Sequence, residues 1–157
     1  MTQRSIPGVE AYWQAFLETL SPDAPAPFAY SSWGFGDSPD MADALGALVM
    51  NEIKTATASL LWAYEAEGEP VPEPGDYSVV LDGMGEPLCI IQTTAVRILP
   101  FDEVGEEHAY LEGEGDRTLA HWQEGHWRFF GRECAALGRE PDPKMPVVCE
   151  RFRLVYP

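Results

Sequence analysis

The amino-acid sequence predicts an α+β fold in which a small barrel or strongly bent sheet is surrounded by helices. Helical and strand patterns mix along the chain without the regular strand–helix alternation of a doubly wound fold. Residues 77–99 have the pattern of a β-hairpin, and residues 146–156 are rich in β-branched and aromatic side chains, as a closing strand would be. The length of 157 residues fits one compact domain, so we expect a single domain over 1–157 with a helical extension at 1–30.

The first third of the chain predicts two helices. Apolar residues recur at three- and four-residue spacing through 7–20, which indicates an amphipathic helix. Three prolines end it, and a second helix begins at Ser38, which can cap, with Pro39 in the first turn. The segment around Lys54 should follow as a short strand or turn, and Ser59 could cap one further helical turn.

The rest of the chain supplies the strands and a long helix. An acidic, Pro- and Gly-rich loop precedes the hairpin, whose two strands are separated by Asp82-Gly83-Met84-Gly85-Glu86. A long helix is predicted at 118–137, where Gly125 lowers the helix propensity and Gly138 lies just after the predicted end. The predicted elements are strands 77–81 and 88–99, a turn with a short helix at 101–110, a helix at 118–137 and a strand at 146–156.

Composition limits the function classes. The chain has 26 Asp and Glu against 10 Lys and Arg, a net charge of -16, which works against binding of long polyanions over a broad surface. Seven of the ten basic residues follow Asp116, so a local positive face is still possible. No apolar run is long enough to cross a bilayer, and the start predicts no signal peptide. Three widely spaced cysteines suggest buried, reduced thiols, and we expect a cytoplasmic protein without a membrane partner.

Lys54 is the most informative residue. It is the only basic residue between Arg4 and Arg97, and it stands beside small hydroxyl residues in Lys54-Thr55-Ala56-Thr57-Ala58-Ser59. Two uses fit this setting: a charged Lys54 that pairs with a carboxylate and orients a ligand, or a partly desolvated Lys54 that assists a hydroxyl. A buried structural salt bridge or a lysine at the edge of a strand is the simpler alternative.

Several segments, in order and spacing, resemble the ASCH domain family, whose barrel is similar to the PUA domain. The resemblance covers roughly residues 33 to 156. The matching segments are Trp33-Gly34-Phe35-Gly36-Asp37, Lys54 to Leu60, Gly75-Asp76, Thr93-Thr94-Ala95-Val96, Phe101-Asp102-Glu103-Val104, Glu112-Gly113-Glu114-Gly115-Asp116 and Val147 to Phe152.

This resemblance implies a PUA-like β-barrel of about five to six mostly antiparallel strands, with a cleft for RNA or a modified ribonucleoside. Some members are described as amidohydrolases that act on N4-acetylcytidine, and others of similar length as ribonucleases. The reactive residues of the amidohydrolase group fall on Lys54, Thr57 and Glu112, with Glu114 as an alternative to Glu112.

Two chemistries follow from these carried-over residues. In amide hydrolysis Thr57 would attack, Lys54 would accept its proton, and Glu112 would serve the leaving amine. Nearby acidic residues favour a charged Lys54, which would instead clamp an oxyanion or a phosphate while a Glu acts as base in RNA cleavage. We therefore expect a hydrolase of one type or the other; a non-catalytic RNA-binding or protein-interaction module is the alternative.

Aromatic, hydroxyl and arginine side chains near the predicted cleft are candidates to bind substrate. Aromatic rings can stack on a base, and arginines can hold phosphate or a base edge, although buried aromatics and surface ion pairs are common without a ligand. The candidates are Trp33, Phe35, Thr55, Ser59, Trp62, Tyr64, Arg117, Arg128 and Arg151.

The sequence predicts no resident metal or cofactor. His121 and His126 are five residues apart, which places them on different faces of a helix, and His108 has no ligand partner at zinc spacing. The acidic residues between Asp102 and Asp116 lack the pattern of a calcium loop. A divalent cation is an option only if the protein cleaves RNA, and the sequence does not determine the oligomeric state.

Overall fold

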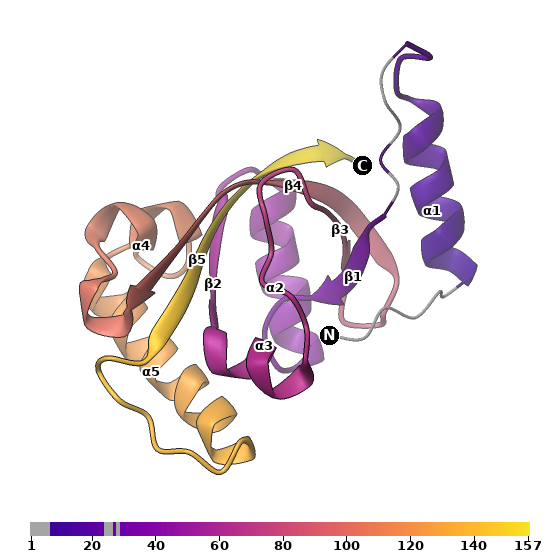
Figure 1. Cartoon of the computed structure of the whole chain (residues 1–157). Helices are drawn as coiled ribbons and strands as arrows, with labels where there is room; N and C mark the ends of the chain where they lie inside the picture. Colours follow the sequence, from indigo (N-terminus) through magenta and orange to yellow (C-terminus); the bar gives the residue numbers. More distant parts are fainter. Residues whose placement is uncertain (1–6, 24–26, 28) are drawn as a thin grey trace.

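Five strands form one curled sheet, open as a half-barrel, with helices on both faces (Figure 1). The computed structural model describes residues 7–23, 27 and 29–157. The strands are β1 (Ser31–Gly34), β2 (Ala56–Leu60), β3 (Tyr77–Leu81), β4 (Pro87–Pro100) and β5 (Pro146–Tyr156). The helices are α1 (Pro7–Glu18), α2 (Pro39–Met50), α3 (Leu61–Glu67), α4 (Glu106–Glu112) and α5 (Leu119–Ala136), with a short 3-10 turn η1 (Phe101–Glu103).

The sheet has the order β1-β3-β4-β5-β2, so the chain's first and second strands lie at opposite edges. Only β1 and β3 pair in parallel; the other three pairs are antiparallel. The pairing of β4 with β5 shifts register between Thr93 and Ala95, and such irregularities increase local bending of a sheet. The α+β, mostly antiparallel barrel expected from the sequence is therefore confirmed.

Three hydrophobic clusters hold the helices against this sheet. Helix α1 packs Val9, Trp13 and Phe16 against Val79 and Ile90. A second cluster joins α2 to the inner side of the sheet, and a third lies beneath α4 and α5. Helix α1 buries residues of the apolar stripe that its three- and four-residue periodicity predicted, whereas α3 has no buried residue.

Most element boundaries follow the sequence expectations. Strands β3 and β5 match their predicted ranges, α1 ends two residues earlier than predicted, and Gly125 does not interrupt α5. Ser38 caps α2 as expected, since its hydroxyl accepts a hydrogen bond from the Met41 amide at 3.2 Å. All three cysteines are free and buried.

Two local expectations were wrong or missing. Ser59 does not cap α3, because Leu60 occupies the N-cap position and the Ser59 hydroxyl bonds to the Tyr64 hydroxyl at 2.9 Å. Strand β1 was not predicted, because four residues with two serines carry too short a pattern to read. Within the described residues, no helix has the length and apolar character needed to cross a membrane.

Candidate active site

The candidate site begins where α2 ends and the chain turns into β2. Glu52 adopts φ 58°, and the Leu48 carbonyl then accepts the amides of both Ile53 and Lys54. The next amide, that of Thr55, donates to Leu111 O at 2.8 Å. This bond ties the start of β2 to the last turn of α4, so Lys54 and Glu112 lie side by side although 58 residues separate them.

Lys54 is a buried ammonium between two carboxylates. Its Nζ lies 3.2 Å from Glu112 Oε1 and 2.8 Å from Glu114 Oε2, and the Lys54 side chain is only 1% exposed. Burial by itself lowers the pKa of Lys54, but the charges of Glu112 and Glu114 outweigh burial and raise it above its ordinary value. The ammonium is therefore charged at neutral pH.

Glu112 is the centre of this hydrogen-bonded group. Oε1 accepts from Lys54 and lies 3.3 Å from His126 Nε2, while Oε2 accepts from His108 at 2.9 Å and from Trp122 Nε1. Burial raises the pKa of Glu112, but the neighbouring Lys54 and His126 charges outweigh it and hold the pKa well below its usual range. An ionised carboxylate has about four acceptor positions, so these four donors saturate Glu112.

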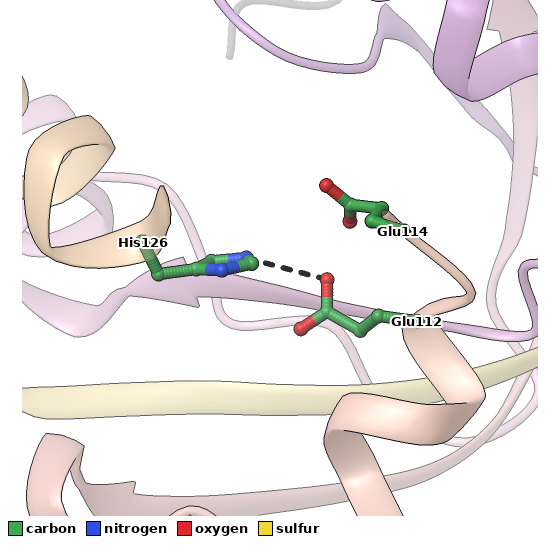
Figure 2. A group of neighbouring side chains, drawn as sticks. All are labelled: Glu112, Glu114 and His126. Atoms are coloured by element: carbon green, nitrogen blue, oxygen red, sulfur yellow. Dashed lines mark ion pairs between the residues drawn. The ribbon is translucent and has the colours of Figure 1, made fainter. Parts of the chain in front are cut away.

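His126 reaches the same group from α5 (Figure 2). Its ring stacks on Trp122 with centroids 4.3 Å apart, and Nδ1 lies 2.9 Å from the Trp122 carbonyl oxygen. Burial lowers the pKa of His126, but the Glu112 carboxylate outweighs burial and raises it above the ordinary value. Thus helix α5 contributes a histidine whose cationic form the Glu112 carboxylate favours.

These side chains form one wall of a hollow with a volume of about 140 Å³. Thr57 and Ala58 of β2 line it, as do Phe35 and two residues of α2. Helix α5 supplies the largest share: His121, Trp122, Gly125, His126, Phe129 and Arg132. The hollow is smaller than the roughly 300–1,000 Å³ typical of sites for drug-sized ligands, so it fits a single base-sized or phosphate-sized group.

One group of His and acidic side chains among the described residues converges closely enough to consider a metal ion. Ligand atoms of Glu112, Glu114 and His126 lie within 4.8 Å of one another. The Lys54 ammonium already stands between the two carboxylates, where a divalent cation would bind. We therefore regard the group as a hydrogen-bonded cluster around a lysine and assign no metal ligands.

The three residues carried over from the family resemblance, Lys54, Thr57 and Glu112, all line this hollow. Among the expected binding residues, Phe35 also lines it, with its ring centroid 5.4 Å from Lys54 Nζ. Trp33 packs edge-on against Phe35 and does not reach the hollow.

The other expected binding residues lie elsewhere because local partners hold them. Thr55 and Ser59 bond to Leu111 and Tyr64, and Trp62 stacks under Arg139 at 3.6 Å. The three arginines are engaged as well: Arg117 with Tyr110, Arg128 with Glu124 and Arg151 with Glu107. None of these residues lines the hollow.

The sequence reading missed the contribution of α5. His121 and His126 were placed on different helical faces, yet both line the hollow because the hollow runs along the helix. Two pairs of residues four apart in the sequence could have predicted side-by-side contacts on a helix: His108 with Glu112, and Trp122 with His126. Each pair lies on one helical face, but which faces meet depends on packing.

Comparison with known proteins agrees with this geometry. A family model described as ASCH domain matches residues 31–156. The chain belongs to the ASCH domain family. ASCH domains are in general RNA-associated domains of the PUA-like superfamily. The search of curated proteins found no match.

Two solved structures are similar over nearly the whole chain. The ASCH domain from Lactobacillus crispatus JV V101 is 34% identical, with a TM-score of 0.91 over 99% of this chain and 98% of that one. Protein EF3133 from Enterococcus faecalis V583 is 42% identical, with a TM-score of 0.84 over 95% of this chain and 88% of that one. The similarity to the first includes α1, which precedes the residues matched by the family model.

Proposed function

We propose that this ASCH domain protein is a hydrolase that recognises RNA and cleaves it at the hollow beside Lys54. The observation that carries the proposal is a buried, charged lysine whose carboxylate partners line a hollow open to a ligand. Burying an ion pair is rarely the most stable solution for a core, so such a cluster in a hollow favours function over packing.

The charge states favour phosphoryl transfer. A charged Lys54 cannot accept a proton, but it can stabilise the negative charge that develops on a phosphate. Glu112 is saturated by four donors, whereas Glu114 bonds to Lys54 through Oε2 and its side chain keeps 25% exposure. Glu114 is therefore the better base for a ribose hydroxyl, with Lys54 as the electrostatic clamp.

Removal of an acyl group from N4-acetylcytidine is the second candidate. Thr57 supports it, because this hydroxyl lines the same hollow as Lys54 and Glu112. The net charge of -16 also favours a small nucleoside over a long RNA. In that reaction Lys54 would hold the oxyanion, and Thr57 would need a base other than Lys54.

The test compares both substrates directly. Purified protein is incubated with a labelled single-stranded RNA and with N4-acetylcytidine, each with Mg²⁺, with Mn²⁺ and with EDTA. We expect RNA cleavage that persists in EDTA, since Lys54 takes the place of a metal. Loss of activity in EDTA alone would instead assign the reaction to a bound divalent cation.

Matched variants assign the activity to the site. Lys54→Met and Glu114→Gln should lower the rate by at least about 100-fold, the scale expected for one electrostatic or base group. Lys144→Met removes the chain's other lysine, which pairs with Asp102 on the surface, and should leave the rate unchanged. RNA binding without turnover of either substrate would favour the non-catalytic module, and equal activity of Lys54→Met would indicate a contaminant. We place the reaction in the cytoplasm, consistent with three unpaired cysteines.

A further inference from the structure

His126 has two hydrogen-bonding partners that can only accept. Its Nδ1 lies 2.9 Å from the Trp122 carbonyl oxygen, and its Nε2 lies 3.3 Å from the Glu112 carboxylate. A neutral imidazole carries one N–H and could satisfy only one of these acceptors. The doubly protonated imidazolium faces an acceptor at both nitrogens, and the Glu112 carboxylate favours this form because it raises the pKa of His126.

The surroundings of His126 stabilise that cation although several charges compete. Glu112 and Glu114 face it from α4 and the following loop, and the Lys54 ammonium pairs with both carboxylates. His121 and Arg132 line the hollow from the same helix, and Arg132 is neutralised by Asp37 at 2.8 Å. Two carboxylates therefore balance Lys54 and His126, and the ring retains 14% exposure toward the hollow.

We propose that His126 is a catalytic residue, the proton donor to the leaving group in the RNA cleavage proposed above. Its Nε2–H bond to Glu112 is long at 3.3 Å, and a ligand oxygen in the hollow can replace that acceptor. The Trp122 carbonyl and the stacked indole keep the ring in place during the exchange. This proposal rests on the proposed function, and no feature of the family resemblance pointed to His126.

The step balances as an attack by the neighbouring ribose hydroxyl. Glu114 takes the proton of the 2′-hydroxyl, and the 2′-oxygen forms a bond to phosphorus while Lys54 stabilises the added negative charge. The bond from phosphorus to the 5′-oxygen breaks, and His126 gives its Nε2 proton to that oxygen. The first products are a 2′,3′-cyclic phosphate and a 5′-hydroxyl end. Water then attacks the cyclic phosphate, the deprotonated His126 takes a proton from that water, and the protonated Glu114 gives its proton to the departing 2′-oxygen, which completes the hydrolysis and restores both residues. No oxidant, reductant or metal is consumed.

A leaving group that needs no proton tests this assignment. His126→Gln keeps a polar side chain of similar size. It should slow cleavage of an RNA dinucleotide by about 100-fold or more, the lower range for a general acid. Cleavage of uridine 3′-(4-nitrophenyl phosphate), whose phenolate leaves unprotonated, should change less than about threefold. Glu124→Gln, on the exposed side of α5, controls for the helix.

The outcomes separate the two proposals. Wild-type protein that cleaves neither substrate would overturn the proposed function, and the His126 role with it. Active wild-type protein with an equally active His126→Gln would overturn only the His126 role. Equal losses on both substrates would make His126 a positioning residue, contrary to the proposal. Nitrogen-15 NMR of the imidazole at pH 7 should show both ring nitrogens of His126 protonated, and a single protonated nitrogen would contradict the charge that the donor role needs.

Discussion

At the scale of single residues, the site is a balance of charges that water does not screen. Lys54 and Glu112 are each 1% exposed, so each would be costly to bury alone. Glu112 is satisfied only because Lys54, His108, Trp122 and His126 all donate to it. No buried side-chain nitrogen or oxygen among the described residues lacks a hydrogen-bonding partner. The residues of the site therefore depend on one another for stability.

Removal of the ammonium should expose this dependence. Lys54→Met keeps most of the length of the side chain but removes the ammonium that pairs with Glu112 and Glu114. We expect a loss of about 3–5 kcal/mol in the free energy of unfolding, the usual cost of breaking a buried pair. Urea denaturation measures it, with Lys144→Met as the matched surface variant that should show no measurable change. A Lys54→Met protein as stable as wild type would contradict the buried ion pair.

The low pKa of Glu112 also predicts acid sensitivity. Its pKa in the folded protein lies well below the unfolded value of about 4.3, so the unfolded state binds a proton first as the pH falls. The stabilisation is present above the unfolded pKa and is lost as the pH falls through the folded pKa. Denaturation curves from pH 6 to pH 3 should therefore decline less steeply for Glu112→Gln than for wild type. Parallel pH dependences would assign the acid sensitivity to other carboxylates.

At the scale of elements, the site forms where the end of one helix meets the start of one strand. The end of α4 and the start of β2 are joined by the Thr55–Leu111 bond, and Gly113 packs against Ile53 at the same junction. Gly113 adopts φ 70°, and a Cβ there would stand 2.5 Å from Ile53 O. Gly113 stands between Glu112 and Glu114 in the sequence, so its close approach to Ile53 sets the distance of both carboxylates from Lys54.

A pair of glycines isolates that effect. Gly68 follows α3 at φ 66°, and a Cβ added there would meet no atom within 4 Å. Gly68→Ala should therefore lower the free energy of unfolding by about 1–2 kcal/mol through the backbone conformation alone. Gly113→Ala adds the clash with Ile53 O and should lower both stability and RNA cleavage further. Thermal melts and rate measurements on both variants provide the comparison. Identical effects on activity would show that the junction does not position the site.

Helix α1 illustrates a second role for an element. It covers Val79 and Ile90 with Val9, Trp13 and Phe16, at the other end of the molecule from α4 and α5 (Figure 1). We propose that the chain is one folding unit in which α1 completes the core and leaves the substrate chemistry to the rest.

At the scale of the whole molecule, charge opposes the proposed substrate. The chain carries a net charge of -16, so its overall field repels a long RNA. Most nucleic-acid-binding proteins show the reverse, with attraction that salt weakens. This protein should therefore select short or locally exposed RNA.

Salt dependence tests that selection. Raising the salt from about 20 to 200 mM shortens the Debye length from about 20 to about 7 Å and screens the repulsion. We expect kcat/KM for a 20-nucleotide RNA to rise relative to kcat/KM for a dinucleotide, because only the longer substrate extends over the acidic surface. A fall in that ratio with salt would indicate a basic RNA path that the net charge conceals.

The sequence by itself determined most of the elements of this protein, although not β1, and pointed to Lys54. Periodicity, prolines and glycines act locally, so α1, α2, β3, β5 and the Ser38 cap could be predicted from neighbours in the chain. The isolation of Lys54 in an acidic sequence and the spacing of Lys54-Thr55-Ala56-Thr57 were equally visible. Local sequence does not show whether an arginine such as Arg128 binds a ligand or only pairs with a neighbouring carboxylate, and the structure pairs Arg128 with Glu124.

Only the tertiary structure decided which side chains face one another. The partners of Lys54 and Glu112 come from the α2–β2 turn, α4 and α5, which meet because three hydrophobic clusters press the helices onto a curled sheet. Charge states follow from that meeting, since burial and neighbouring charges together set them. The packing of α5 brings His126 to Glu112 and to the hollow, and the spacing of His126 from Trp122 within the helix did not show which residues that face would meet.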